Sequence, residues 1–229
     1  SPVGSLAGYW AAYGRSSFAM VKSEANVYID GFNLYYGCVK DTSYRWLNLS
    51  KLCTLLLPGY SIKQIKYFTS LITPQPKEPQ QLQRQLTYIR ALRTIPNLSI
   101  YYGQFLTHPV WRPLAHPPMR GSTVVEVLDT KEKGSDVNLA SHLLLDGFTK
   151  DCDIAVIMSN DSDLVEPIKL ATSKLGLPVG ILHPHRRRSK ELSQVAEFYR
   201  SIRERVLKAS QFPPILRDAS GTITKPTSW

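Results

Sequence analysis

The fold is decided by the stretch "DIAVIMSNDSDLVEPIKLATSKLG", residues 153–176. Its first part, 153–159, is an apolar run without alternation, which is typical of a strand covered by helices on both faces. Its last part, 163–176, has the apolar spacing of a helix. Asp161 and Asp163 stand between these two parts. We therefore predict a strand, a loop and a helix, with two carboxylates at the carboxyl end of the strand.

Strand-like and helix-like segments alternate through the rest of the chain. This rhythm predicts an α/β fold, a three-layer sandwich in which helices flank a mostly parallel central sheet. Strands are expected at 26–30, 98–106, 122–129 and 177–183, with a strand-like part in 62–72. Helices are expected at 48–57, 77–93, 134–148 and 189–209.

The expected domain spans residues 20–209. We take residues 1–19 as an extension outside the fold, either added or disordered. The Pro-, Ser-, Thr- and Gly-rich segment 210–229 is expected to be a loose tail. Segment 107–121 contains four prolines and interrupts the α/β rhythm. It is expected to be a long connection of the kind that is often functional.

The composition favours a nucleic-acid partner. The chain has 229 residues, a formal charge of +10 and a pI of about 9.5. Such a surplus favours a polyanion, nucleic acid before acidic lipid, although solubility alone is the simpler explanation. No apolar run approaches the roughly 18 residues of a membrane span, so no membrane association is expected. The three cysteines show no zinc-binding spacing, which favours a reducing, cytoplasmic location.

Acidic residues from distant parts of the sequence are expected to meet. Asp30 ends the first strand, Asp161 and Asp163 follow the most buried strand, and Asp136 lies in the first turn of a buried helix. In open parallel sheets, ligands bind outside the carboxyl ends of the strands. Each acid also has a structural explanation: Asp136 suits a helix amino terminus, Asp161 suits a helix cap, and Asp30 suits a turn.

Such a cluster suits a hard divalent cation. Mg²⁺ prefers oxygen ligands and keeps several waters, so a few carboxylates and a substrate phosphate make a suitable site. A cation also removes the mutual repulsion of the acids. A site of this kind can activate water and stabilise charge on a phosphodiester.

The basic surplus is concentrated near the same edge. Residues 183–208 hold eight Lys or Arg against three Glu, a net charge of +5. These cations can contact phosphates without sequence preference, and an exposed aromatic ring can stack on a base. The alternatives are a solvated loop for the arginines and core packing for the aromatic side chains. The residues assigned to nucleic-acid binding are Arg186, Arg187, Arg188, Lys190, Lys133 and Trp111.

Three motifs carry a resemblance to a known family. They are "YIDGFNLYYG" (28–37), "EKGSDVNLASHLLLDGF" (132–148) and "IMSNDSDLVEPI" (157–168). Together, over roughly 26–200, they resemble the NYN domain, a LabA-like branch of the PIN-like nucleases. The resemblance implies a PIN-like fold and RNA cleavage dependent on Mg²⁺ or Mn²⁺.

The resemblance also implies roles for individual residues. The acidic, metal-binding centre would consist of Asp30, Asp136, Asp161 and Asp163. Asn33 and Ser159 would be accessory polar groups that orient a carboxylate or a metal-bound water. Family members often carry another acid six residues after the K-G-x-D aspartate, where this chain has His142. That departure bears on whether a second ion binds.

The sequence therefore predicts a divalent-metal-dependent endoribonuclease that uses a metal-activated water and forms no covalent intermediate. Its partner would be single-stranded or structured RNA, and homo-oligomerisation is left open. One alternative is a catalytically silent RNA-binding or interaction module of the same fold. Another is a different metal-dependent phosphohydrolase, although Tyr28 departs from the D-x-D-G-T pattern of aspartate-nucleophile phosphatases.

Overall fold

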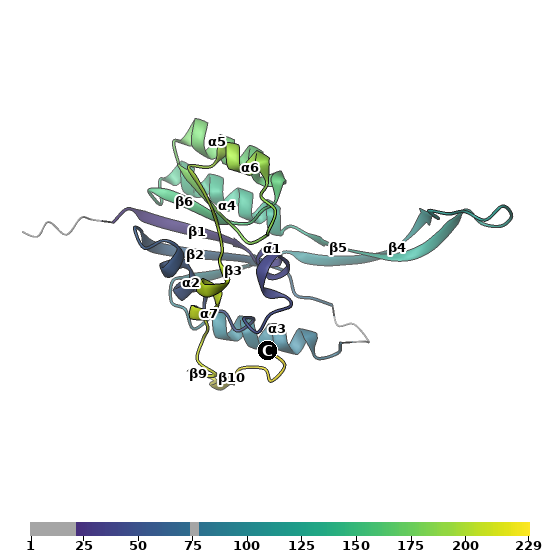
Figure 1. The fold of residues 1–229 in the computed structure, drawn as a ribbon, viewed down its shortest axis with the longest axis horizontal. Coiled ribbons are helices and arrows are strands. Elements are labelled where there is room, and N and C mark those ends of the chain that lie inside the picture. Colours follow the sequence, from purple (N-terminus) through teal and green to yellow (C-terminus); the bar gives the residue numbers. More distant parts are fainter. Residues whose placement is uncertain (1–21, 74–77) are drawn as a thin grey trace, which may run out of the picture.

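A computed structural model describes residues 22–73 and 78–229, so the extension expected at 1–19 lies outside the described residues. Its centre is a six-stranded sheet in the order β3-β2-β1-β6-β7-β8, and all neighbouring strands pair in parallel (Figure 1). The strands are β1 (Glu24–Asp30), β2 (Ser61–Thr69), β3 (Leu98–Tyr102), β6 (Ile154–Met158), β7 (Val179–His183) and β8 (Phe198–Ser201). The α/β fold predicted from the sequence is confirmed.

The strand order reverses between β1 and β6. From β1 the chain proceeds outward through β2 and β3, whereas from β6 it proceeds the other way through β7 and β8. Loops that leave two such neighbouring strands diverge to opposite faces and leave a crevice at the carboxyl edge. Asp30 ends β1, and Ser159 to Asp163 follow β6. The topology therefore sets both acidic motifs beside the same crevice.

Helices cover both faces of the sheet (Figure 1). One face packs on α2 (Leu49–Leu56), α3 (Gln81–Leu92) and α7 (Glu204–Ala209), and the other on α4 (Ser135–Thr149), α5 (Val165–Leu175) and α6 (Lys190–Val195). Short helical segments follow β1 and β6: α1 (Gly31–Leu34), η2 (Tyr35–Val39) and η3 (Ser162–Leu164). Among the described residues, no helix has the length and apolar character that a bilayer crossing demands.

The segment expected to be one helix at 189–209 contains a strand. It divides into α6, β8 and α7. Phe198 pairs with Gly180 of β7, where an added Cβ would lie 2.2 Å from the Phe198 ring. The phenyl ring thus covers a glycine in the neighbouring strand, a packing that favours a strand over a helix.

The C-terminal segment 210–229 differs from the expected loose tail. Two antiparallel strands form a hairpin, β9 (Ile215–Asp218) and β10 (Gly221–Thr224). Ile223 is buried, and the Arg90 guanidinium donates two hydrogen bonds to Asp218, of 2.7 and 2.6 Å. These tertiary contacts outweigh a composition that by itself indicates a turn-rich, exposed segment.

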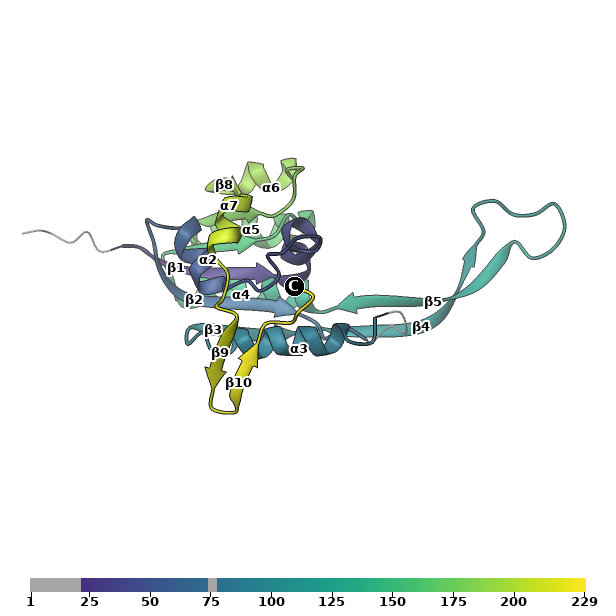
Figure 2. The same cartoon turned by 60° about the horizontal axis from the view of Figure 1, so that its bottom comes forward.

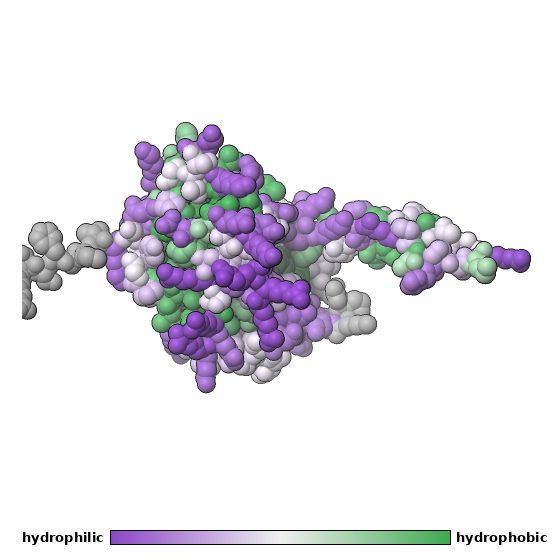
Figure 3. All heavy atoms as spheres, turned by 45° about the horizontal axis from the view of Figure 1, so that its top comes forward, coloured by the Kyte–Doolittle hydropathy of each residue, from purple (hydrophilic) through white to green (hydrophobic). Residues whose placement is uncertain are grey.

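In the segment expected to be a long connection, residues 107–113 belong to an antiparallel ribbon, and 114–121 lie in the loop that joins its two strands. Strands β4 (Gln104–Pro113) and β5 (Val124–Lys133) pair along their whole length and project from the body as an arm (Figures 1 and 2). The predicted strand 98–106 ends at Gly103, and β4 begins a new one. Hydrophobic residues lie along this arm (Figure 3), and Trp111 and Leu128 are strongly exposed. Pro109 and Pro113 fit here because a two-stranded ribbon consists of edge strands.

Candidate active site

Asp30 is the buried member of the acidic group. Its Oδ1 accepts a hydrogen bond from the Asn33 backbone N–H at 2.9 Å, and its Oδ2 accepts one from the Ser159 hydroxyl at 3.0 Å. Burial raises the pKa of the carboxyl, and these two hydrogen bonds oppose that rise. The geometry fixes one carboxylate at the end of β1, with Ser159, the residue directly after β6, as its partner.

Asp161 and Asp163 begin the segment that follows β6. Asp161 Oδ1 accepts a hydrogen bond from the Asp163 backbone N–H at 3.0 Å, and therefore caps η3. The Asp161 N–H donates to Ser159 Oγ at 3.1 Å. Capping thus accounts for one of the two carboxylate oxygens of Asp161. Its other carboxylate oxygen has no hydrogen-bond or ion-pair partner in the described part of the chain.

Asp136 is brought to this group by the turn before α4. Gly134 precedes the helix with φ near +100°, a conformation that L side chains rarely adopt, so the glycine of K-G-x-D is required by the backbone. Loss of surrounding water and then the charges of Asp30, Asp161, Glu132 and Asp163 raise the pKa of Asp136 to about 6. Mutual repulsion of this kind shows that the acids share one electrostatic environment.

Glu132 is a member of this group that the sequence analysis missed. It lies at the end of β5, where its Oε1 accepts a hydrogen bond from the Ser70 hydroxyl at 2.7 Å. The same oxygen accepts one from the Ser135 N–H at 3.3 Å. The sequence feature that could have indicated Glu132 is its position four residues before Asp136, within "EKGSD". We call Asp30, Glu132, Asp136, Asp161 and Asp163 the acidic edge.

The acidic edge lacks a protein cation. Throughout residues 22–73 and 78–229, none of its carboxylates forms an ion pair with a Lys, Arg or His. In the same residues, no three Asp, Glu, His or Cys side chains are grouped tightly enough to hold an ion by themselves. The all-oxygen donor set fits Mg²⁺ or Mn²⁺, and Mg²⁺ typically takes one or two carboxylates together with water and substrate phosphate.

The accessory residues join the loops around the acidic edge. The Asn33 Oδ1 accepts a hydrogen bond from the Asn160 N–H at 3.0 Å, which ties α1 to the loop after β6. The Asn160 side-chain amide donates to the Arg187 carbonyl at 3.2 Å, which brings the arginine loop alongside. Asn160 was absent from the sequence-based site, because a loop asparagine carries no signal of its own.

The predicted nucleic-acid contacts fall into two groups. The larger group lies close to the acidic edge: exposed Arg186, Arg187 and Arg188 in the loop after β7, exposed Lys190 at the start of α6, and exposed Lys133 at the end of β5. Trp111 lies on the arm, six residues along β4 from Phe105, the partner of Glu132. That spacing places it roughly 20 Å from the acidic edge.

His142 lies apart from the acidic edge, six residues farther along α4 and hence about 9 Å along the helix from Asp136. Its ring packs on Tyr101 with centroids 4.0 Å apart, and its buried Nδ1 has no hydrogen-bond partner among the described residues. Burial and then the charge of Lys66 lower the pKa of His142, which favours the neutral form of the ring. His142, at the position where family members often carry an acid, therefore packs against Tyr101 of β3.

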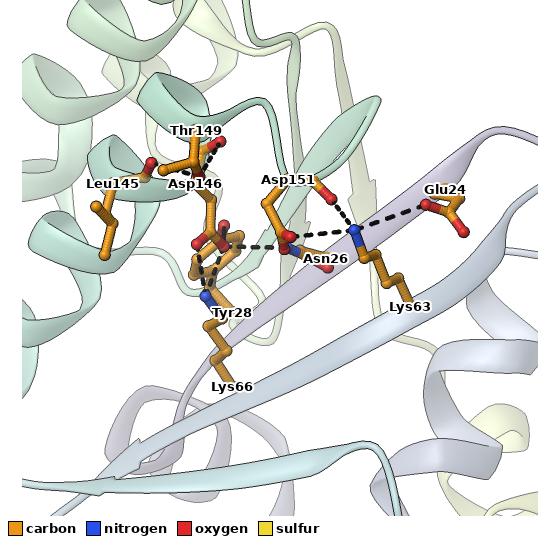
Figure 4. Close-up of polar contacts among 9 residues, drawn as sticks. All are labelled: Glu24, Asn26, Tyr28, Lys63, Lys66, Leu145, Asp146, Thr149 and Asp151. Atoms are coloured by element: carbon orange, nitrogen blue, oxygen red, sulfur yellow. Dashed lines mark hydrogen bonds and ion pairs between the residues drawn. The ribbon is translucent and has the colours of Figure 1, made fainter.

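A second charged cluster lies under α4 (Figure 4). Lys66 Nζ lies 2.7 and 2.6 Å from the two carboxylate oxygens of Asp146, and both residues are only 4% exposed. Tyr28 and Asn26 also donate to Asp146 Oδ2, and the latter bond is 3.0 Å. We call Asn26, Tyr28, Lys66 and Asp146 the buried network.

Comparisons with known proteins identify the family and the fold. The family model described as the NYN domain matches residues 24–203. A curated relative, 6-hydroxy-3-succinoylpyridine 3-monooxygenase HspA of Pseudomonas putida, is 28% identical over 89% of this chain and 74% of its own. A crystal structure of a protein of unknown function, VPA0982 from Vibrio parahaemolyticus, covers 81% of this chain and 96% of its own. Its TM-score is 0.53 at 16% identity, which is a likeness of fold.

Proposed function

The chain belongs to the NYN domain family, and from that premise we propose that it is a divalent-metal-dependent endoribonuclease. One observation carries the proposal: the acidic edge draws five carboxylates from β1, β5, α4 and the segment after β6, and within the described residues none of them forms an ion pair with a Lys, Arg or His. Uncompensated charge of this kind is unfavourable for folding, and persists where function requires it.

The residues of the acidic edge have distinct tasks in this proposal. Asp30, Asp136, Asp161 and Asp163 would hold Mg²⁺ or Mn²⁺, which supplies a polarised water and charge stabilisation at the phosphodiester. Ser159 and the Asn33 N–H fix the Asp30 carboxylate, so that it needs no rearrangement when the substrate binds. Arg186, Arg187, Arg188, Lys190 and Lys133 would surround this negative centre with positive charge and attract the RNA backbone.

The test is cleavage of a labelled single-stranded RNA in Mg²⁺, in Mn²⁺ or in EDTA. We expect cleavage with either metal, none in EDTA, and at least a 100-fold loss for Asp161→Asn. The matched control is Asp153→Asn. Asp153 directly precedes β6, the strand that Asp161 follows, and its carboxylate accepts a hydrogen bond from the Glu24 N–H. Cleavage that survives both EDTA and Asp161→Asn contradicts the metal-dependent mechanism.

Two other outcomes favour the alternatives from the sequence. Salt-dependent RNA binding without cleavage under every metal favours a silent binding module of the same fold. Hydrolysis confined to small phosphomonoesters favours a different phosphohydrolase. A DNA substrate of the same sequence distinguishes a ribonuclease from a general nuclease, because only RNA carries the 2′-hydroxyl.

The curated relative suggests a second candidate. Its name describes monooxygenation of 6-hydroxy-3-succinoylpyridine, and the similarity extends over 89% of this chain. Under this candidate the chain would oxidise a small heteroaromatic acid with O₂ and a two-electron reductant. Oxygen uptake that requires both the pyridine and the reductant supports it, and the absence of such uptake removes it.

A further inference from the structure

A pocket of about 830 Å³ opens beside the acidic edge, at the carboxyl ends of β7 and β8. This volume lies within the range of roughly 300–1,000 Å³ that is typical of pockets for small organic molecules. One wall comes from η2 and the residues after it, and the other from β7, β8 and the loop between β7 and α6. Its polar and aromatic lining includes Tyr36, Lys40, His183, Arg186, Arg188 and Tyr199.

The two walls are joined at Gly37. A Cβ added to this residue would lie 2.8 Å from Pro184 Cβ and 3.0 Å from His185 Cδ2, so only glycine allows this approach. Gly37 lies within η2, a π-helical turn, and such turns occur frequently at functional sites. Backbone packing therefore sets the shape of the pocket before any ligand binds.

The lining combines an exposed aromatic face with cations from both walls. Tyr36 is 59% exposed, and Lys40 Nζ lies 5.2 Å from the centre of its ring. On the other wall, the Arg188 guanidinium lies 4.9 Å from the centre of the Tyr199 ring. Aromatic rings stack on planar bases, and a guanidinium placed beside a ring offers directed donors to an anion.

The remaining charges do not cancel these cations. The lining contains Lys40, Arg186 and Arg188 against Asp41 and Glu204, a net charge of +1. Glu204 is further occupied, because it accepts a hydrogen bond from the Tyr44 hydroxyl at 3.0 Å. Buried His183 donates from Nδ1 to the His185 carbonyl at 3.0 Å, which leaves Nε2 as a hydrogen-bond acceptor in the neutral ring.

A hydrogen bond links the pocket to the loop that carries Asp161. The Tyr199 hydroxyl donates to the Asn160 Oδ1 at 2.6 Å. Asn160 directly precedes Asp161, and its own N–H is held by Asn33. The Tyr199 wall of the pocket is therefore tied through Asn160 to the loop that carries Asp161 and Asp163.

We propose that this pocket binds a planar heteroaromatic ring bearing an anionic group, and that the natural source is a nucleotide of the bound RNA next to the cleaved bond. The RNA source rests on the proposed ribonuclease function, whereas the ring-and-anion chemistry of the pocket does not. Tyr36 stacks on the ring, and Arg188 and Lys40 pair with the phosphate.

The first test is calorimetric titration of the full chain with AMP in EDTA, which measures the pocket without the metal. We expect Arg188→Gln and Tyr36→Ala each to weaken AMP binding about tenfold. The matched control is Arg200→Gln, whose guanidinium lies 4.6 Å from the Phe198 ring but outside the pocket lining. Ribose 5-phosphate, which lacks the ring, is expected to bind at least tenfold more weakly than AMP. AMP affinity that is the same in all three variants, or no AMP binding, overturns the proposal.

Further measurements distinguish the two sources of the ligand and the two proposals. Nicotinate that binds more tightly than AMP, and is lost in the same variants, assigns the pocket to a free heteroaromatic acid and overturns the RNA source. AMP binding that Arg188→Gln weakens, in a chain that cleaves no RNA, supports the pocket while the ribonuclease proposal fails. Metal-dependent cleavage with the same KM in Arg188→Gln and Arg200→Gln overturns the RNA source of the pocket's ligand while the ribonuclease proposal stands.

Discussion

The acidic edge and the buried network each include residues of β1, Asp30 in the first and Asn26 and Tyr28 in the second. They differ in whether their carboxylates are paired with a cation. In the buried network, Asp146 faces Lys66 and accepts hydrogen bonds from Tyr28 and Asn26 (Figure 4). At the acidic edge, carboxylates face one another, and their repulsion contributes to the raised pKa of Asp136. One cluster contains its own counterion and the other does not.

This difference separates structural charge from functional charge. In the buried network the Asp146 carboxylate is paired with the Lys66 ammonium, so neither charge needs a ligand to neutralise it. A group of carboxylates at an open crevice is incomplete until a cation arrives, and it lowers the stability of the ligand-free fold. The same Asp→Asn substitution should therefore have opposite effects in the two clusters.

The largest expected effect is on the buried network. Asp146→Asn leaves the Lys66 ammonium buried without an anion, which should lower the free energy of unfolding by about 3–5 kcal/mol. Urea denaturation measures this change. Lys66→Met should also destabilise the fold, and Lys66→Met with Asp146→Asn should cost less than the sum of the single changes. Strictly additive losses would show that the two side chains do not act as a pair.

A somewhat smaller effect, on activity, is expected at the acidic edge. Asp30→Asn should lower RNA cleavage by about 100-fold or more, which corresponds to about 2.7 kcal/mol in the barrier. The fold should persist, because Asn retains an oxygen that can accept from the Asn33 N–H or Ser159. Circular dichroism of the Asp30→Asn variant checks that it is folded, and the cleavage rate is measured on the same sample. An active Asp30→Asn variant would remove the acidic edge from the mechanism.

Metal addition should stabilise the wild-type chain through the acidic edge. At ten times the dissociation constant, Mg²⁺ should contribute about 1.4 kcal/mol and raise Tm by about 3–5 °C. Differential scanning fluorimetry measures the shift, with NaCl at the same ionic strength as the control. The increase should disappear in Asp161→Asn and persist in Asp153→Asn. An equal increase in both variants would place metal binding elsewhere.

The smallest expected effect is a gain in stability without metal. The pKa of Asp136 is about 6 in the folded chain, against an ordinary 3.8, so the unfolded chain releases this proton first as pH rises. Folding stability therefore falls between about pH 4 and 6, and the loss is fully present above pH 6. After solvent screening, Asp136→Asn should raise Tm at pH 7 in EDTA by about 1–3 °C.

The pH dependence is the control for this gain. The advantage of Asp136→Asn should shrink as pH falls from 6 towards 4, because the wild-type carboxyl then binds a proton as well. A gain of the same size at pH 4.5 and pH 7 would attribute it to altered packing around α4 instead of charge.

Much of this molecule is readable from local pattern. The apolar run at 153–159 predicts a doubly covered strand, and the α/β alternation predicts a parallel sheet. Because parallel strands carry their carboxyl ends to one edge, the meeting of Asp30 with Asp161 and Asp163 follows from sequence.

Other features depend on contacts that no local pattern encodes. Lys66 looks like an ordinary surface lysine in "IKQIKYF", yet it is buried because α4 brings Asp146 across the sheet. Glu132 joins the acidic edge because β5 returns along β4 to the body, where its side chain meets Ser70. The hairpin of β9 and β10 is held by Arg90 of α3.

The sequence by itself thus determined the layers of the fold and the edge at which its acids gather, because periodicity and strand direction are properties of neighbouring residues. Only the tertiary structure decided which charges are neutralised and which are left for a ligand. Counterions, desolvation and hydrogen-bond partners come from residues far apart in the chain, and the energy of a buried charge depends on all of them together.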